Sequence, residues 1–227
     1  FKPHAWPDSY SLTCDYEIVG LGSFGSSLAV LTKGNPYLVS GTSPDSMIME
    51  KLEINLPCIN SRSIQDLGYA IAYASYDGLV MVSSSGANVV TSGIFNREEW
   101  NKLNPRTFST GQRDSRYFAA YSYVDGDEGL KQGTLIIDTS GEQPFIIRTS
   151  IYPSAFFYDL VSGALYYVVD NGIYEWDAVG KPYNVQAWRS KEFILPKPAN
   201  FGVIYIDSDD AMNADEIAAL NQQAQEA

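Results

Sequence analysis

The chain contains four consecutive groups of three strand-like runs, and this pattern constrains its fold more than any other feature. The runs are rich in Tyr, Val, Ile and Phe, which favour β-strands, and short turns separate most of them. They are residues 17–21, 26–32 and 36–41; 69–75, 79–84 and 88–93; 116–123, 134–139 and 144–150; and 155–161, 164–170 and 173–178. Each group predicts an antiparallel meander, except that the first connection of the third group, residues 124–133, reads as a long polar loop.

The second turn of every group contains a glycine, and the four are Gly34, Gly86, Gly141 and Gly172. Their spacings of 52, 55 and 31 residues are too irregular for a strict sequence repeat, yet they repeat one hairpin design. Propeller blades are four-stranded meanders of about 40–50 residues, and we expect fourth strands at 47–54 and 192–195. The sequence therefore predicts an all-β, propeller-like array of antiparallel β-meanders, with a β-sandwich as the competing arrangement.

Two helices interrupt the strand pattern, and both begin with the same capping signal. Asn96 and Glu99 form a predicted capping box, Phe95 and Trp100 occupy the hydrophobic staple positions, and the helix is expected to stop before Pro105. This helix reads as a short insertion between the second and third groups. A C-terminal helix is predicted from about residue 213, where the capping pattern recurs. We expect residues 1–200 to form the β domain, incomplete and part of a longer chain, and residues 201–227 to begin a further segment.

The glycines Gly20, Gly22 and Gly25 match G-x-G-x-x-G, the dinucleotide-binding pattern. That pattern requires a helix directly after the third glycine, but only eight strand-like residues separate Gly25 from the next turn. We therefore expect these glycines to allow a tight bend between two strands whose backbones approach closely.

The balance of charge disfavours a nucleic-acid-gripping protein. The chain has 27 acidic and 15 basic residues and a net charge of −12, and such a surface repels phosphates. The hydrophobic fraction of 45% supports a substantial core, and no apolar run is long enough to predict a membrane span. Free thiols are favoured for Cys14 and Cys58, although the sequence leaves open whether they pair.

No residues are predicted to be catalytic, to bind a cofactor or to hold a metal. The acidic run 125–128 reads as a solvated turn, and 207–210 departs from a calcium loop because Ala211 and Met212 stand at its fifth and sixth positions. His4 reads as a surface or packing residue, and the charged stretch 189–192 as an exposed edge strand or a subunit contact. The acids near strand ends, which would be the candidates in a glycan hydrolase, are Asp77, Asp114, Asp138, Asp159, Asp170 and Glu175. No pair of them stands out, so turn formation is their expected role.

Several stretches together carry a family resemblance: residues 3–41, 43–53, 58–82, 97–105 and 188–202. Through them the chain resembles a family of virion structural proteins of tailed bacteriophages and prophages, and it is distantly similar to the tail hub or nozzle proteins of short-tailed phages. The resemblance covers roughly residues 3–202 and implies a propeller-like β domain with no catalytic residues to carry over. The helical segment 207–227 is unfamiliar in this family, which puts the family's usual C-terminal region in doubt.

The resemblance implies a structural subunit of a phage tail, made in the host bacterial cytoplasm and located in the virion. Its implied partners are further copies in a ring, commonly a hexamer, other tail and connector proteins, and passing DNA without sequence-specific binding. A propeller-type enzyme acting on host glycans and a monomeric propeller binding module are the alternative functions. We expect the protein not to be an enzyme.

Overall fold

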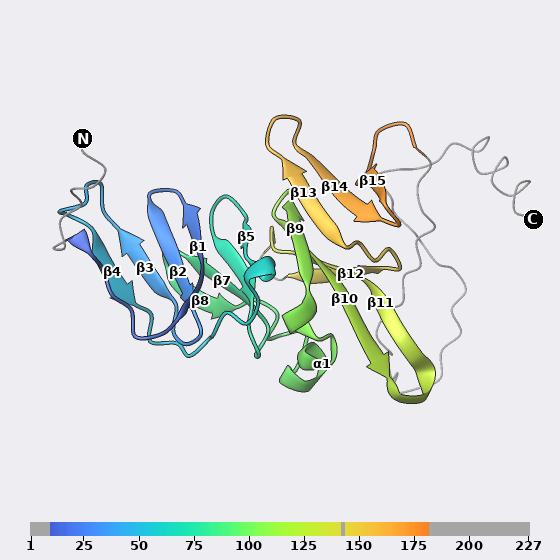
Figure 1. The fold of residues 1–227 in the computed structure, drawn as a ribbon, viewed down its shortest axis with the longest axis horizontal. Helices are drawn as coiled ribbons and strands as arrows, with labels where there is room; N and C mark the ends of the chain where they lie inside the picture. The colour runs from blue at the N-terminus through green and yellow to red at the C-terminus, as the bar shows by residue number, and fades with distance from the viewer. Residues whose placement is uncertain (1–9, 142–143, 182–227) are drawn as a thin grey trace, which may run out of the picture. The chain divides into compact units, whose positions relative to one another are not determined.

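The computed structural model describes residues 10–141 and 144–181 (Figure 1). The chain divides into two compact units, Phe1–Lys181 and Pro182–Ala227, and every described residue belongs to the first. Outside the described residues lie His4, the acidic run 207–210, the stretch 189–192, the predicted strand at 192–195 and the predicted helix from about residue 213. The predicted boundary at residue 200 also lies outside them and stays a prediction.

The described residues form four antiparallel sheets whose strands follow one another in chain order. Sheet 1 contains β1 (Ile18–Phe24), β2 (Ser27–Thr32), β3 (Tyr37–Ser40) and β4 (Ile48–Lys51). Sheet 2 contains β5 (Gln65–Asp66), β6 (Ile71–Ala74), β7 (Leu79–Ser83) and β8 (Gly86–Val89). Sheet 3 contains β9 (Ser109–Arg113), β10 (Arg116–Asp125), β11 (Gly129–Asp138) and β12 (Phe145–Thr149). Sheet 4 contains β13 (Ala155–Asp159), β14 (Ala164–Val169) and β15 (Gly172–Glu175).

The first strands of successive sheets lie against one another. β1 contacts β5 and β6, β5 contacts β9, and β9 contacts β13 and β14. Consecutive meanders that meet through their first strands are arranged as the blades of a propeller are. The prediction of an all-β, propeller-like array of antiparallel β-meanders is therefore confirmed, together with the short helical insertion, α1 (Arg97–Lys102).

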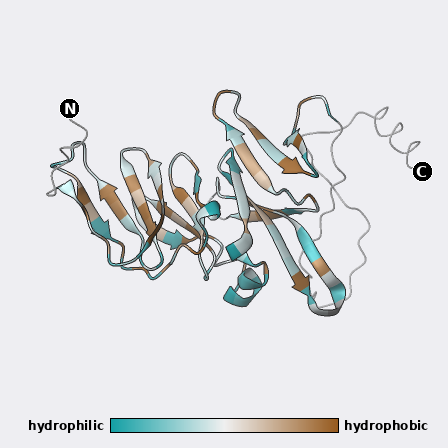
Figure 2. Cartoon of the chain, viewed as in Figure 1, coloured by the Kyte–Doolittle hydropathy of each residue, from teal (hydrophilic) through white to brown (hydrophobic). Residues whose placement is uncertain are grey.

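Apolar side chains join each sheet to the next. Phe24, Ala29 and Leu31 of sheet 1 share one buried cluster with residues of β6 and β7. A larger cluster joins sheets 2 and 3, and a third joins sheet 3 to sheet 4 around Phe118 and Leu165. Hydrophobic residues are frequent along the strands, whereas α1 is largely hydrophilic (Figure 2). Some strands, such as β6, are buried along their whole length, so they carry a continuous apolar run in place of alternation.

The glycine motif fulfils the expected role of allowing a tight bend. Gly25 has a φ of +54° in the two-residue connection between β1 and β2, and β2 follows it directly instead of a helix. A Cβ atom on Gly20 would lie 2.3 Å from Cδ1 of Ile64, and one on Gly22 would lie 2.7 Å from Cδ1 of Ile71. Because both positions lack a side chain, Ile64, which precedes β5, and Ile71 of β6 pack closely onto β1.

The capping box at residue 96 is confirmed. The Asn96 side chain accepts a hydrogen bond from the backbone N–H of Glu99, and the Glu99 carboxylate accepts one from the N–H of Asn96. Phe95 and Trp100 pack with their ring centroids 5.9 Å apart, as the staple predicts. The helix thereby places Trp100, which is fully buried, between sheets 2 and 3.

One prediction about the strands is wrong, and two strands were not predicted. β5 and β9, each the first strand of its sheet, were not predicted because Gln65–Asp66 and Ser109–Arg113 have little of the apolar pattern of a strand. Residues 124–133 do not form a long polar loop: β10 and β11 continue their pairing to Asp125 and Gly129, and only the short 3₁₀ helix η4 (Gly126–Glu128) turns the chain. Cross-strand pairing therefore overrides the polar composition of this segment.

Two turns of the last three meanders also differ in position from the prediction. β8 begins at Gly86, so the turn before it is Ser84–Ser85. The turn of sheet 4 is formed by Asp170 and Asn171, both with positive φ, and Gly172 is already part of β15. Asp and Asn tolerate the left-handed region because their short polar side chains bond locally.

Candidate functional site

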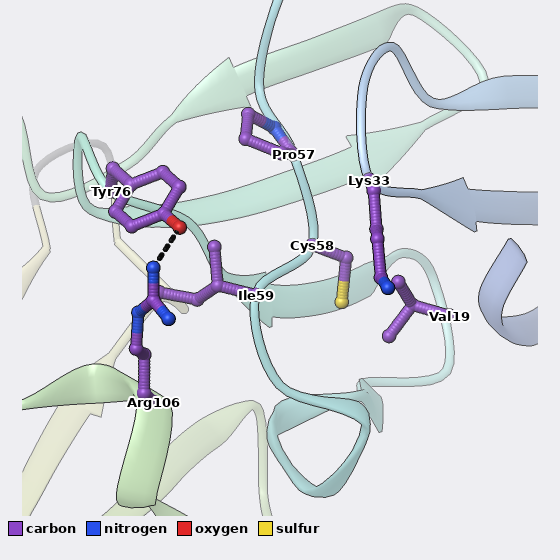
Figure 3. A pocket seen from close by; sticks show the side chains of 7 residues that line it. All are labelled: Val19, Lys33, Pro57, Cys58, Ile59, Tyr76 and Arg106. Carbon is purple, nitrogen blue, oxygen red and sulfur yellow. Dashed lines mark hydrogen bonds between the residues drawn. The ribbon is translucent and has the colours of Figure 1, made fainter. Parts of the chain in front are cut away.

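A shallow recess of about 370 Å³ lies where sheets 1 and 2 meet the 3₁₀ helix η3 (Pro105–Thr107). Its apolar lining is Val19, Pro57 and Ile59, and two basic side chains, Lys33 and Arg106, also line it (Figure 3). We call it the basic recess. Residues 57–59 run between Tyr76 and Arg106 on one side and Val19 and Lys33 on the other (Figure 3).

Backbone hydrogen bonds fix the segment 57–59. The N–H of Cys58 donates to the carbonyl of Thr32 at the end of β2 (2.9 Å), and the N–H of Ile59 donates to the carbonyl of Ala74 at the end of β6 (3.2 Å). The segment therefore connects two sheets, and the recess is a consequence of that connection.

Cys58 is the one thiol that lines the recess, and its surroundings disfavour reactivity. Its side chain is buried, and its Sγ donates a weak hydrogen bond to the carbonyl of Asn60 (3.6 Å). Burial raises the pKa of the Cys58 thiol to about 11, so the reactive thiolate is scarce at neutral pH. Both cysteines are free thiols, and Cys14 is half-buried.

The two cations of the recess differ in their partners. The Lys33 ammonium pairs with Glu17 at 2.7 Å, and both side chains are exposed. The Arg106 guanidinium lies 5.2 Å from the centre of the Tyr76 ring and donates a hydrogen bond to the Tyr76 hydroxyl. No acid in the part of the chain that the structure describes pairs with Arg106, so an anionic group could approach its guanidinium.

A second, smaller hollow of about 260 Å³ lies beside α1. Each of its cations lies over an aromatic ring: Lys102 over Tyr123 at 5.6 Å and Arg148 over Phe95 at 5.8 Å. Lys102 also pairs with Asp125 at 2.7 Å. These contacts hold α1 against β10, so the hollow serves packing.

Three of the strand-end acids form ion pairs. The pairs are Asp77 with Arg97 (3.2 Å), Asp114 with Arg113 (3.2 Å) and Asp138 with Arg116 (2.8 Å). Burial acts to raise the pKa of the Asp138 carboxyl, but hydrogen bonds from Arg116 and Ser140 outweigh burial and lower that pKa. A lowered pKa holds Asp138 ionised, which does not suit a general acid.

The remaining acids shape the ends of strands. The Asp159 carboxylate accepts hydrogen bonds from the Ser162 hydroxyl and the backbone N–H of Val161, and these bonds lower its pKa. Asp170 has a φ of 48° in the turn before β15, and Glu175 is the last residue of β15. The predicted role in turns is confirmed for Asp159 and Asp170. Within residues 10–141 and 144–181, no cluster of three or more His, Cys, Asp or Glu side chains could hold a metal.

Exposed apolar side chains gather on sheet 4. Phe156 and Tyr158 of β13 pack toward sheet 3, so the strand alternation turns Phe157 to the opposite face, where it is 66% exposed. Ile173 of β15 shares that face and is 75% exposed. Sequence reasoning missed both this face and the basic recess, because neither follows from a local motif.

The acidic run 125–128 forms the predicted turn between strands. Asp125 ends β10 and pairs with Lys102, and Glu128 pairs with Lys131 at 3.0 Å. Among the described residues, no helix is long and apolar enough to cross a membrane.

Similarity to known proteins was found only among solved structures. No protein-family model matches the chain, and no curated protein matches it. Among solved structures it is similar to the N-terminal domain of Nup159, with 10% identity and a TM-score of 0.27 over 72% of this chain and 61% of that one. It is also similar to a chain in a S. cerevisiae complex of Dbp5 with Nup159, Gle1, IP6 and ADP, with 10% identity and a TM-score of 0.28 over 76% of this chain and 64% of that one. The chain thus spans less than two thirds of each matched chain, and TM-scores this low carry no argument.

Proposed function

We propose that this protein is a structural subunit of a phage tail, of the tail hub or nozzle kind, and that it acts through assembly with no catalytic role. In this proposal several copies form a ring, commonly a hexamer, around the channel through which DNA leaves the particle. The ring contacts other tail and connector proteins, and the protein is located in the virion. The sequence resemblance over residues 3–202 supports the assignment, and much of that stretch builds the four sheets.

One observation carries the proposal: several buried polar groups of the described residues join neighbouring parts of the fold, while apolar side chains are exposed on sheet 4. Asn60, for example, donates to the carbonyls of Pro105 and Phe108 and so joins the segment that precedes sheet 2 to the segment that precedes sheet 3. Phe157 and Ile173, by contrast, lie on an open face of sheet 4. Exposed apolar side chains that share one face of a sheet favour protein–protein contact there, as expected of a subunit in an assembly.

The net charge of −12 suits a protein that DNA must pass. Phosphates are repelled by an acidic wall, so DNA slides along it without being held. A ring whose lumen is lined by Lys and Arg would contradict this part of the proposal.

The glycan-acting enzyme is less well supported. A glycosidase needs two carboxyl groups facing each other across the substrate, and the strand-end acids of the described residues are engaged in separate ion pairs and turns. Asp→Asn variants at positions 77, 138 and 159 should therefore leave unchanged any glycan-cleaving activity detected with the purified chain.

The decisive experiment locates the protein in the particle. The chain would be tagged in the phage genome that encodes it, and purified particles would be analysed by mass spectrometry, gold labelling and cryo-electron microscopy. We expect several copies at the tail end, with a closed ring visible in averaged particles. Absence of the tagged chain from particles that retain infectivity would reject the proposal. A particle-bound single copy would favour the monomeric binding module.

A further inference from the structure

The β10–β11 hairpin extends beyond its sheet. β9 pairs with β10 only as far as Ala120, and β12 pairs with β11 only from Thr134, so residues 121–133 form a two-stranded ribbon (Figure 1). We call these residues the arm. An isolated two-stranded ribbon is marginally stable in water, so the arm requires additional contacts.

One face of the arm obtains these contacts from α1. Tyr121 and Tyr123 stack with their ring centroids 6.1 Å apart, and Lys102 of α1 reaches both the Tyr123 ring and the Asp125 carboxylate. This face is therefore occupied within the subunit.

The opposite face carries an apolar pair that is left exposed. Val124 and Leu130 lie directly across from each other in the ribbon and are 73% and 62% exposed. By composition, residues 121–133 hold three acids and one lysine. Asp125 pairs with Lys102 of α1, and Glu128 pairs with Lys131. The arm thus ends in an apolar pair beside an excess of acid.

The basic recess has the complementary chemistry. Its apolar lining consists of Val19, Pro57 and Ile59. Of its two cations, Lys33 pairs with Glu17, whereas Arg106 contacts Tyr76 and pairs with no acid among residues 10–141 and 144–181. Its volume of about 370 Å³ falls in the range of pockets that enclose a few side chains. Positive surface is scarce on a chain with 27 acids and 15 bases, so a basic, partly apolar recess is a selective target for an acidic, apolar arm.

We infer that the arm of one subunit docks in the basic recess of a second copy of this chain, with Val124 and Leu130 against the apolar lining and the acidic turn near Arg106. Arm and recess are different patches, so the contact is heterologous, and it builds a ring when the rotation between copies closes. The inference rests on the proposed ring-forming function and names the contact that would build the ring.

Site-specific cross-linking tests the contact directly. Photo-reactive benzoylphenylalanine would replace Val124, and equal amounts of ordinary and ¹⁵N-labelled full chain would be mixed before illumination, at high concentration and in assembled particles. We expect cross-linked peptides of mixed isotope composition that join position 124 to residues 57–59 or to the segments around Lys33 and Arg106. The same probe at Ile48, which is 68% exposed on β4, is the control and should not select the recess.

A charge swap provides an independent measurement. Arg106→Glu alone and Glu128→Arg alone should each weaken self-association about tenfold, because each places like charges together. The double variant should recover most of the loss, since every contact in the ring then has reversed charges. Lys33→Glu is a second recess variant that leaves the Arg106 contact with Tyr76 in place, and circular dichroism and melting temperature check the fold.

Failures of the two proposals are distinguishable. If the chain forms a ring in particles but position 124 cross-links to another surface, to another protein or only within one copy, the arm contact is wrong and the tail function stands. Lack of recovery in the charge-swapped double variant also overturns the contact. If the chain is absent from particles, the tail function is wrong whatever the cross-links show.

Discussion

The interface between sheets 2 and 3 and the outer face of sheet 4 contain similar apolar side chains in opposite environments. In the interface, Trp100, Phe108 and Tyr117 are fully buried, and their polar atoms have partners: the Trp100 indole N–H donates to the carbonyl of Ser75 (2.7 Å) and the Tyr117 hydroxyl to that of Ser63 (2.7 Å). On sheet 4, Phe157 and Ile173 face outward. The first region holds the subunit together, and the second is available to partners.

Removing a ring from each region should give the largest contrast. Trp100→Ala is expected to lower the free energy of unfolding by about 3–5 kcal/mol, because it leaves a cavity against Phe95 and Phe108 and an unpaired Ser75 carbonyl. The matched variant Phe157→Ala should change it by about 0.5 kcal/mol or less. Urea denaturation followed by fluorescence or circular dichroism measures both. Equal losses would show that the outer face of sheet 4 is part of the core.

The close approach of sheets 1 and 2 can be tested at a glycine. Gly22→Ala is expected to cost about 1–3 kcal/mol, because its Cβ would lie within 3 Å of three carbons of the buried Ile71 side chain. Gly93→Ala is the control, since nothing lies within 4 Å of a Cβ there. The double variant Gly22→Ala with Ile71→Ala should lose less than the sum of the two single losses, which a double-mutant cycle measures.

The same contrast separates what the sequence predicts from what it does not. The strands of the four meanders and α1 follow from local signals: apolar runs, turn residues and the Asn96–Glu99 box. β5 and β9 do not, because Gln65 and Ser109 lie in strands specified by neighbouring strands instead of by their own composition. A strand can be predicted from its own residues where those residues carry the apolar pattern, and not where its pairing partners specify it.

The basic recess could not be predicted for a related reason. Val19, Ile59 and Arg106 are about 40 or more residues apart in the chain, and only the contacts between sheets bring them together. Likewise, strand alternation shows that β13 has two faces, but both carry aromatic residues, so the sequence does not reveal which face stays open.

An ion pair of sheet 3 should give a smaller, pH-dependent effect. Arg116 donates to the carboxylate of Asp138 (2.8 Å), whose side chain is 4% exposed, and Asp138→Asn is expected to cost about 1–2 kcal/mol at pH 7. The pKa of Asp138 is lowered in the folded state. The contribution of its ionised carboxylate to the stability of the fold is therefore complete above the ordinary pKa of 3.8. It is lost as the pH falls through the lowered value.

The measurement for this pair is denaturation of wild type and Asp138→Asn at pH 7, 5, 4 and 3. The difference in free energy of unfolding between the two proteins should stay constant from pH 7 to pH 5 and become smaller below pH 4. Thr139→Val is the control, because it lies beside Asp138 and changes no carboxyl group. Its difference from wild type in free energy of unfolding should be the same at every pH. A difference for Asp138→Asn that becomes larger as the pH falls would contradict the assignment.

The smallest expected effect lies in the turn of sheet 4 and tests whether this sheet opens independently of the interface between sheets 2 and 3. Asn171 has a φ of 65° in a two-residue turn, so Asn171→Gly should stabilise sheet 4 by about 0.3 kcal/mol and Asn171→Ala should destabilise it by about 1 kcal/mol. The backbone groups of Val168 and Trp176 join neighbouring strands. Their amide hydrogen exchange should therefore slow in Asn171→Gly and speed up in Asn171→Ala, while the exchange rate of Leu135 stays constant. Val161→Ala, at an exposed position outside the turn, is the control and should leave the exchange rates of sheet 4 and of Leu135 unchanged. If Leu135 shifts as much as Val168, sheet 4 unfolds together with that interface, and its open apolar face must be counted as part of one cooperative unit.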